Sequence, residues 1–215
     1  KDHAPIALTT SEIQTIISQF KEATKRAVKA GYEIIEIHGA HGYLAHQFLS
    51  PLINIRKDEY GGSFENRTRF ILEIVKAVQT ELTTQSLWVR LSATDWAEGG
   101  WTCFETVKLA QILKEKGVEV MDISTGGAVR NQEIPINKNY QVPFAERIKK
   151  EAQTITGAVG LIDSGIQAEE ILQNNQADLI FVAREFLRNP HFVYQAALDL
   201  GVEIDWAPQY ERGKE

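Results

Sequence analysis

The sequence predicts an α/β fold built around a parallel sheet. Stretches with helical hydrophobic spacing alternate along the chain with short strands, and the strands are almost uniformly apolar. Strands covered by helices on both faces lose the alternation of a half-exposed sheet and become continuously apolar. The repeated order of strand and helix is typical of parallel strands connected through helices. We count five such strands, each followed by a helix.

The elements are marked by caps and by apolar spacing. The first helix is expected over 10–30, because Thr9 and Glu12 form a capping-box pattern and Gly31 provides a C-cap. The strands are expected at 32–37, 87–91, 118–123, 158–162 and 178–182. The later helices are expected to begin near 63 and to cover 102–117, 144–153, 168–174 and 190–200. No linker divides the chain, so residues 1–215 are expected to belong to a single domain.

The composition excludes several classes of protein. Of 215 residues, 43% are hydrophobic and 24% are charged, which is typical of a folded protein rather than a disordered one. No stretch approaches the roughly 20 apolar residues that a membrane span requires. The formal net charge of −6 argues against a nucleic-acid or anionic-membrane partner. A single cysteine, Cys103, allows no internal disulfide and predicts a reducing, cytoplasmic compartment.

Polar side chains stand at the carboxyl ends of all five expected strands. In parallel α/β folds these ends meet at one rim, where ligands bind. The residues concerned are His38, His41, Tyr43, Arg90, Ser92, Asp122, Ser124, residues 163–165, Ala183 and Arg184. The two arginines lie near buried strands, so they need an anion or an acceptor-rich ligand to offset their desolvation.

The spacing of His38 and His41 leaves three interpretations open. A metal site needs three or more ligands, and even with Glu36 and His46 nearby the chain supplies no full set, so we expect no bound metal. Two neutral imidazoles can instead donate hydrogen bonds to one substrate oxygen and stabilise negative charge that develops there. In the third interpretation, these are loop histidines that only pack on their neighbours.

The ends of the fourth and fifth strands resemble a phosphate cradle. Gly165 allows the backbone to approach an anion closely, and the N-terminus of the following helix supplies free N–H donors. Arg184 adds a bidentate donor. The alternative is structural: a glycine at the start of a helix, and an arginine paired with a core carboxylate.

Two long segments carry a resemblance to a known family. Residues 36–52 read EIHGAHGYLAHQFLSPL, and residues 54–67 read NIRKDEYGGSFENR. This signature resembles the Old Yellow Enzyme family of FMN-dependent ene-reductases. The segments 88–92, 160–173, 177–190 and 209–213 are similar to its subgroup of bacterial NADPH dehydrogenases. The resemblance implies a (β/α)8 TIM-type barrel that is incomplete here, because the chain looks like the C-terminal part of one FMN-binding barrel domain, with strands four to eight.

The resemblance implies a substrate site at the end of the first strand. His38 and His41 match the pair that binds the carbonyl, nitro or phenolate oxygen of a ligand stacked on the flavin. Gly39 and Ala40 lie between them in the same motif. Tyr43 matches the tyrosine proposed to protonate the substrate carbon.

The resemblance also implies residues for the cofactor and for assembly. Arg90 matches the arginine that contacts the flavin pyrimidine ring, and Gly165, Ala183 and Arg184 match the FMN phosphate site. Ala183 stands where family members commonly carry glycine, so its methyl group narrows that site. Arg212 matches an arginine that reaches into the active site of a neighbouring subunit, which implies a homo-oligomer.

The implied activity is reduction of small activated alkenes, such as α,β-unsaturated carbonyl or nitro compounds. NADPH or NADH reduces FMN, and the reduced flavin passes a hydride to the alkene. The main alternative is a non-catalytic, truncated barrel fragment that holds no flavin and associates with itself through open strand edges. A different phosphate-binding barrel enzyme, such as an aldolase or isomerase, lacks support because no strand end carries a lysine suited to that chemistry.

Overall fold

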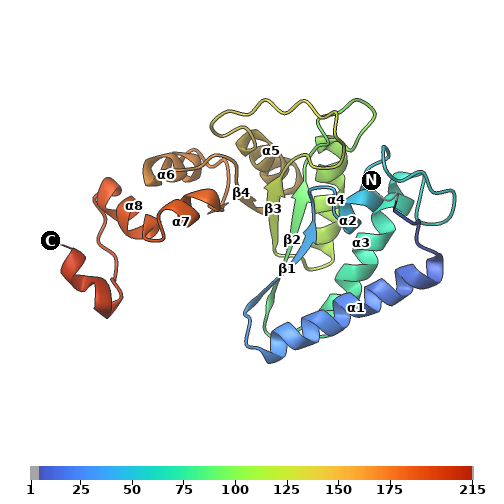
Figure 1. The fold of residues 1–215 in the computed structure, drawn as a ribbon, viewed down its shortest axis with the longest axis horizontal. Coiled ribbons are helices and arrows are strands. Elements are labelled where there is room, and N and C mark those ends of the chain that lie inside the picture. Colours follow the sequence, from blue (N-terminus) through green and yellow to red (C-terminus); the bar gives the residue numbers. More distant parts are fainter. Residues whose placement is uncertain (1–4, 215) are drawn as a thin grey trace.

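The computed structural model describes residues 5–214, which form a five-stranded sheet (Figure 1). Neighbouring strands are all parallel and follow the order of the chain. The strands are β1 (Ile34–Gly39), β2 (Ser86–Ser92), β3 (Val120–Ser124), β4 (Ile155–Ala158) and β5 (Leu179–Ile180). The predicted α/β class with five parallel strands is therefore confirmed.

Helices connect each strand to the next. They are α1 (Thr10–Lys29), α2 (Leu44–Leu49), α3 (Phe64–Gln79), α4 (Cys103–Glu115), α5 (Val142–Ala152), α6 (Gly165–Gln173), α7 (Arg184–Arg188), α8 (Phe192–Leu200) and the 3-10 helix η1 (Pro208–Gly213). In Figure 1, α3 and α4 lie along one side of the strands, whereas α6, α7 and α8 extend away from β1 beyond β4. Within residues 5–214, no helix has both the length and the apolar character needed to cross a membrane.

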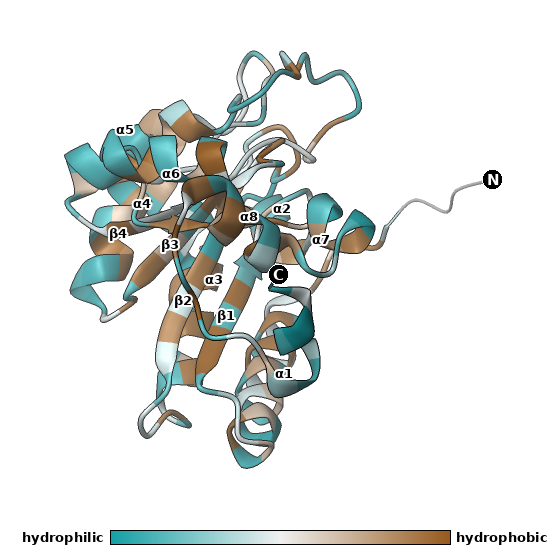
Figure 2. Cartoon of the chain, turned by 90° about the vertical axis from the view of Figure 1, so that its left-hand side faces the viewer, coloured by the Kyte–Doolittle hydropathy of each residue, from teal (hydrophilic) through white to brown (hydrophobic). Residues whose placement is uncertain are grey.

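Alternate strand residues form the core that the helices cover. Ile37 of β1, Val89 and Leu91 of β2, and Met121 and Ile123 of β3 are all 2% exposed or less and belong to one hydrophobic cluster. The residues between them point to the other face of the sheet, because successive strand side chains alternate. Figure 2, turned by 90°, shows both hydrophobic and hydrophilic residues along β1 and β2.

The strand register brings polar residues together on that other face. His38 of β1 pairs with Arg90 of β2, and Arg90 pairs with Asp122 of β3. Two residues further along, Ser92 pairs with Ser124. The sheet thus aligns a row of polar groups across three strands at their carboxyl ends, where the sequence predicts a ligand site.

Helix α1 starts as predicted. The Thr9 side chain accepts a hydrogen bond from the Glu12 backbone, and the Glu12 carboxylate accepts one from the Thr9 backbone N–H at 2.7 Å. Ile13 and Ile17 are the buried hydrophobic residues of this helix, which packs against α3.

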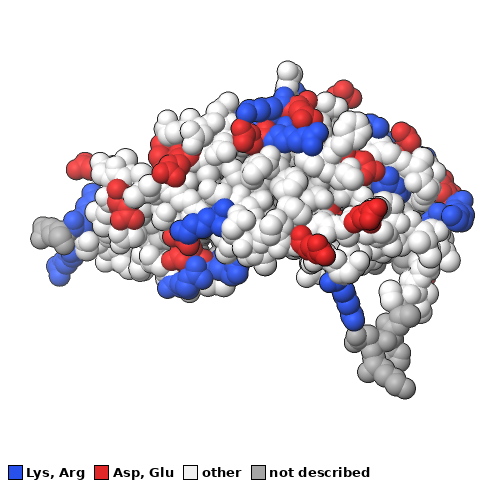
Figure 3. All heavy atoms as spheres, turned by 90° about the horizontal axis from the view of Figure 1, so that it is seen from above, with Lys and Arg blue, Asp and Glu red and all other residues white. Residues whose placement is uncertain are grey.

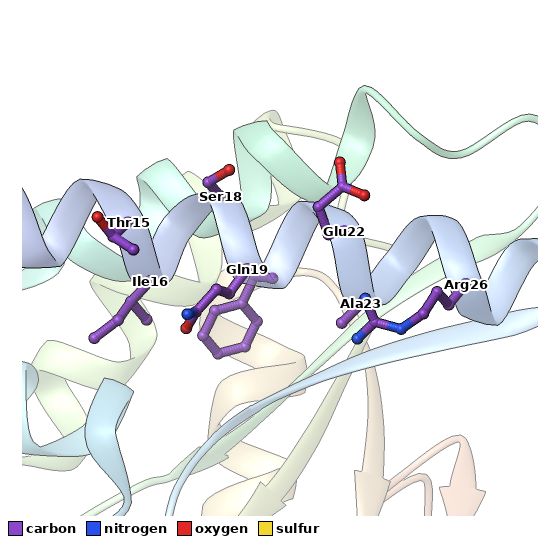
Figure 4. Close-up of a pocket in the computed structure, with 8 residues that line it drawn as sticks. Thr15, Ile16, Ser18, Gln19, Glu22, Ala23 and Arg26 are labelled. Carbon is purple, nitrogen blue, oxygen red and sulfur yellow. The ribbon is translucent and has the colours of Figure 1, made fainter.

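The edge of the sheet beside α1 carries apolar surface. Ile16 and Ala23 line a groove of about 670 Å³ and point to the same side of the helix (Figure 4). A second groove, of about 330 Å³, runs from Phe20 to Ile34 on β1. Ile34 remains 45% exposed, and β1 has no strand on its outer side in the part of the chain that the structure describes.

Several predicted boundaries are wrong. Strand β4 covers 155–158 rather than 158–162, because Gly160 (φ +119°) and Leu161 (φ +53°) leave the extended region and end the strand. Strand β3 begins at Val120 and ends one residue later than expected, and β5 is reduced to two residues. The short helices α2 and α7 were not predicted, since six and five residues are too few to show helical spacing.

Surface charge is mixed. Acidic and basic side chains are interspersed over the face shown in Figure 3, whereas a nucleic-acid-binding surface typically carries a basic stripe. Cys103 is buried at the start of α4, where burial raises the pKa of its thiol.

Candidate functional site

The rings of three predicted catalytic residues lie together at the end of β1. The ring centroids of His38 and His41 are 5.3 Å apart, and those of His38 and Tyr43 are 5.2 Å apart. Tyr43 is 63% exposed, whereas Ala40 is fully buried. Gly39 is also buried, and a Cβ there would lie 2.8 Å from the Ile71 side chain. Any contact that Gly39 or Ala40 makes with a ligand therefore comes from the backbone.

The turn after β1 is pressed against the loop after β3. His41 and Gly42 both have left-handed backbones, with φ of +59° and +74°. A Cβ on Gly42 would lie 2.1 Å from the carbonyl oxygen of Gly127, and one on Gly127 would lie 2.5 Å from the Cα of His41. The backbone N–H of His41 donates to Ser92 Oγ at 3.0 Å. This packing fixes where the histidine pair stands.

The His41 ring is held by a chain of polar side chains. His41 Nε2 lies 2.7 Å from Ser124 Oγ, and Ser124 donates its hydroxyl proton to Gln141 Oε1 at 3.1 Å. Because that proton is used, His41 Nε2 is the donor to Ser124. In the described part of the chain, the His38 ring makes no hydrogen bond.

Both histidines are neutral at pH 7. Burial lowers the pKa of His41 to about 4, and the positive charge of Arg90 acts in the same direction. The pKa of His38 is lowered for similar reasons, first by burial and then by Arg90. A neutral imidazole carries one N–H, so each ring is able to donate a single hydrogen bond to a ligand.

Arg90 pairs with His38 in the strand register and faces the carboxylate of Asp122. Its Nε is 2.9 Å from Asp122 Oδ2. Among the described residues, neither Arg90 Nε nor Asp122 Oδ1 has a hydrogen-bond partner of good geometry. Burial raises the pKa of Asp122 to about 7, with Arg90 opposing and Glu36 reinforcing that rise. The ion pair leaves polar atoms of both partners without a well-aligned hydrogen bond, as a site that takes a further polar group would.

A cavity of about 240 Å³ joins Arg90 to the ends of β4 and β5. Its wall includes Ser124, Gln141, Ala183, Arg184 and Arg188. Arg188 pairs with Glu185, whereas Arg184 has no ion-pair partner within residues 5–214. The cavity thus offers a free guanidinium at one end and Arg90 at the other.

Gly165 and Arg212 lie apart from these groups. Gly165 starts α6 outside the cavity wall, and a Cβ there would lie 2.5 Å from that of Ala196 on α8. Its small size is therefore required by helix packing, a different reason from the close approach to an anion that the sequence suggested. Arg212 is exposed in η1, at the far end of the segment that carries α6, α7 and α8 (Figure 1).

Sequence reasoning missed the residues that support the site. Gln141 is 3% exposed and accepts hydrogen bonds from Ser124 and Thr125, yet no strand end marks it. Asp95 is fully buried, and its Oδ1 lies 2.9 Å from His46 Nε2. A single sequence gives no signal for either, except that a polar residue inside a buried stretch needs a partner. Within the described residues, no group of three or more His, Cys, Asp or Glu side chains is arranged to hold a metal ion.

Comparison with known proteins finds relatives over nearly the whole chain. Residues 2–202 match the model of the NADH:flavin oxidoreductase / NADH oxidase family. An NADPH dehydrogenase of Geobacillus sp. (strain WCH70) is 53% identical over 213 residues, covering 99% of this chain and 62% of the relative. One from Halalkalibacterium halodurans is 53% identical over 212 residues, with the same coverage.

Solved structures show the same likeness. Morphinone reductase in complex with tetrahydroNAD matches with a TM-score of 0.74 and 29% identity, over 95% of this chain and 54% of that one. A complex of 2-naphthoyl-CoA reductase matches with a TM-score of 0.82 and 25% identity, over 92% of this chain and 30% of that one.

The fold and the rim site define a protein of the TIM-barrel class, with part of the barrel present in this chain. The matching enzymes span the same strands and continue beyond them. The chain belongs to the NADH:flavin oxidoreductase / NADH oxidase family, and the resemblance to Old Yellow Enzymes is confirmed. It spans about three-fifths of the length of the curated relatives that it matches.

Proposed function

We propose that this chain is part of an FMN-dependent oxidoreductase that uses NADPH or NADH to reduce small activated alkenes. The observation that carries the proposal is the pair of neutral histidines at the carboxyl end of β1, beside Arg90 and the cavity that leads to Arg184. Family membership supports the flavin and the nicotinamide, since the family is named for NADH and flavin and the relatives are NADPH dehydrogenases.

The residues present suit FMN. The guanidinium of Arg90, which lines the cavity and is paired through Nε with Asp122, would lie beside the pyrimidine edge of the ring system, and the guanidinium of Arg184 would bind the phosphate. The backbone of Ala183 lines the same cavity. Gly165 opens helix α6 outside this cavity, so its match to the phosphate site stays an expectation from the family resemblance. When bound, FMN supplies the hydride that an alkene receives.

The histidine pair and Tyr43 suit the substrate. His38 has its ring N–H available, and a ligand oxygen would replace Ser124 as the acceptor for His41 Nε2. Two donors on one oxygen stabilise the negative charge that develops there when the β-carbon is reduced. The Tyr43 side chain is exposed, and its ring centroid lies 5.2 Å from that of His38. We therefore assign its phenol as the proton donor to the α-carbon.

The test is a visible spectrum of the purified chain, followed by NADPH consumption with cyclohexenone. We expect flavin absorbance, or its gain on adding FMN, and consumption of NADPH that depends on the alkene. Tyr43→Phe is expected to slow alkene reduction by about a hundredfold while leaving reduction of the flavin by NADPH unchanged. A protein that neither carries nor gains FMN contradicts the proposal.

A second candidate follows from the exposed edge of the sheet. The free side of β1, with Ile34 exposed and two grooves on α1, favours association of copies that lack flavin. Under the first candidate, a homo-oligomer would instead bring Arg212 of one subunit to the site of another. Size-exclusion chromatography and an activity assay of two variants separate the two candidates. If copies pair through the strand edge, Ile34→Lys is expected to reduce their association in chromatography. If one subunit completes the site of another, Arg212→Ala is expected to lose activity.

A further inference from the structure

We propose that His46, which lies outside the ligand-binding pair, is a positioning residue that holds the turn carrying His41 and Tyr43, and that Asp95 fixes its tautomer. The geometric part stands on its own. Its consequence for ligand affinity rests on the proposed function.

His46 joins the turn to a buried carboxylate. The His46 and Asp95 side chains are both fully buried. Nε2 of His46 lies 2.9 Å from Asp95 Oδ1, and Nδ1 lies 2.9 Å from the backbone nitrogen of Gly42. Because a backbone N–H only donates, His46 Nδ1 is the acceptor and has no proton. The proton is therefore on Nε2 and points at Asp95, which selects one neutral tautomer.

Asp95 is itself fixed from three directions. Oδ1 accepts from His46, while Oδ2 accepts from Ser50 Oγ at 2.6 Å and from the backbone N–H of Trp101 at 2.8 Å. Burial raises the pKa of Asp95, but these hydrogen bonds outweigh it and the net shift is downward, so the carboxylate is charged. A charged, fully bonded acceptor is what holds the Nε2 proton of His46 in place.

The turn needs such support because its backbone is unfavourable. A non-glycine residue such as His41 in the left-handed region costs about 1 kcal/mol or more, and the conformation persists only where surrounding bonds impose it. His46 supplies the acceptor for the Gly42 N–H. Gln47, one residue further along α2, donates to the Gly42 carbonyl at 2.7 Å. Both hydrogen bonds come from the same short helix, so α2 holds the turn in position from one side.

Loss of the His46 acceptor is expected to release the turn. The Gly42 N–H would then lie unsatisfied in a crowded position, and the adjacent His41 ring would lose its fixed direction. His38, which belongs to β1 itself, is held by strand pairing and would stay in place. Loss of His46 therefore affects the concerted action of the pair rather than the fold of the sheet.

Two variants separate positioning from packing. His46→Asn places an amide oxygen near Nδ1, so it keeps an acceptor for Gly42 but does not reach Asp95. His46→Gln extends an amide N–H toward Asp95 but lacks the acceptor for Gly42. Ser50→Ala is the matched control, since it removes one bond to Asp95 and leaves the turn untouched.

The readouts are NMR of the imidazole nitrogens and amide exchange of Gly42. In the unmodified chain, two-bond proton–nitrogen spectra are expected to show His46 as the Nε2–H tautomer. The Gly42 amide is expected to exchange about ten- to a hundredfold faster in His46→Gln, and to change little in His46→Asn and Ser50→Ala. The KM for cyclohexenone is expected to rise in His46→Gln above that in His46→Asn, with FMN content unchanged.

Each of the following results either supports or overturns the positioning role of His46. An Nδ1–H or charged His46 in the unmodified chain overturns the inference, as does equal exchange of Gly42 in both variants. If His46→Asn does not fold, the comparison of His46→Gln with Ser50→Ala still tests it. If the tautomer and exchange are as expected but the chain shows no alkene reduction, the proposed function fails while the role of His46 in the turn stands.

Discussion

Replacing Gly42 by alanine tests the close approach between the turn after β1 and the loop after β3. The structure assigns two penalties to this change. The backbone of Gly42 has φ +74°, which a Cβ disfavours, and that Cβ would lie 2.1 Å from the carbonyl oxygen of Gly127. Gly31 provides the matched control, because it has φ +88° and nothing within 4 Å of the added carbon.

The two penalties differ in size and can be separated. A left-handed backbone costs an L-residue about 1–2 kcal/mol, and both variants incur this cost. Both also gain the same stabilisation from a less flexible unfolded chain. The clash with Gly127 is a contact between two backbones, so relief requires the turn to move, and overpacking of this kind costs about 1–3 kcal/mol. The free energy of unfolding of Gly42→Ala is therefore expected to be about 1–3 kcal/mol lower than that of Gly31→Ala.

The assay is equilibrium unfolding in urea, followed by the fluorescence of the tryptophans. The midpoint of Gly42→Ala is expected below that of Gly31→Ala, with the same dependence on urea concentration. If the two variants are equally stable, then the turn does not press on Gly127, and the account of how His41 is positioned is wrong.

Three further outcomes are expected. The pKa of His41 is lowered to about 4 from an ordinary value of 6.5, so between these pH values the unfolded chain binds a proton that the folded chain does not. The contribution of His41 to the free energy of unfolding is therefore complete above about pH 6.5 and is lost as the pH falls toward 4. His41→Gln is expected to reduce this pH dependence in urea unfolding measured across that range. Arg184→Ala is expected to weaken FMN binding about ten- to a hundredfold in a fluorescence titration, whereas Arg147→Ala, an exposed surface change on α5, leaves it unaltered. Trp101→Phe removes the bond from Nε1 to Thr106 Oγ1, 2.7 Å long in a fully buried position, and is expected to lower stability by about 1–3 kcal/mol in urea; a loss below about 0.5 kcal/mol contradicts that role of the indole.

Strand and helix identity followed from the sequence wherever the pattern was long. The 20 residues of α1 carry a capping box and four turns of apolar spacing, so both its existence and its start were predictable. Strand β4 was displaced because an apolar run alone does not reveal that Gly160 and Leu161 turn left-handed. The short helices α2 and α7 depend on contacts with the rest of the fold, which no local pattern records.

In the candidate site, too, the sequence predicted some residues, whereas the role of others was visible only in the structure. His38, Arg90 and Asp122 were placed at strand ends by sequence, and the register then set them side by side. The reason for Gly165 changed, because only the packed structure shows Ala196 against it. Gln141 and Asp95 had no visible role until their partners from distant segments were in place.

The sequence by itself determined the class of fold, the rim on which polar groups gather and the family signature of residues 36–67. These features are local, because they depend on periodicity along the chain and on which residues follow each strand. Only the tertiary structure decided that the two histidines are neutral, that Arg90 faces Asp122, and that His46 supports the turn. Burial and hydrogen bonding between residues up to 83 positions apart set those properties, and neither is defined before the chain folds.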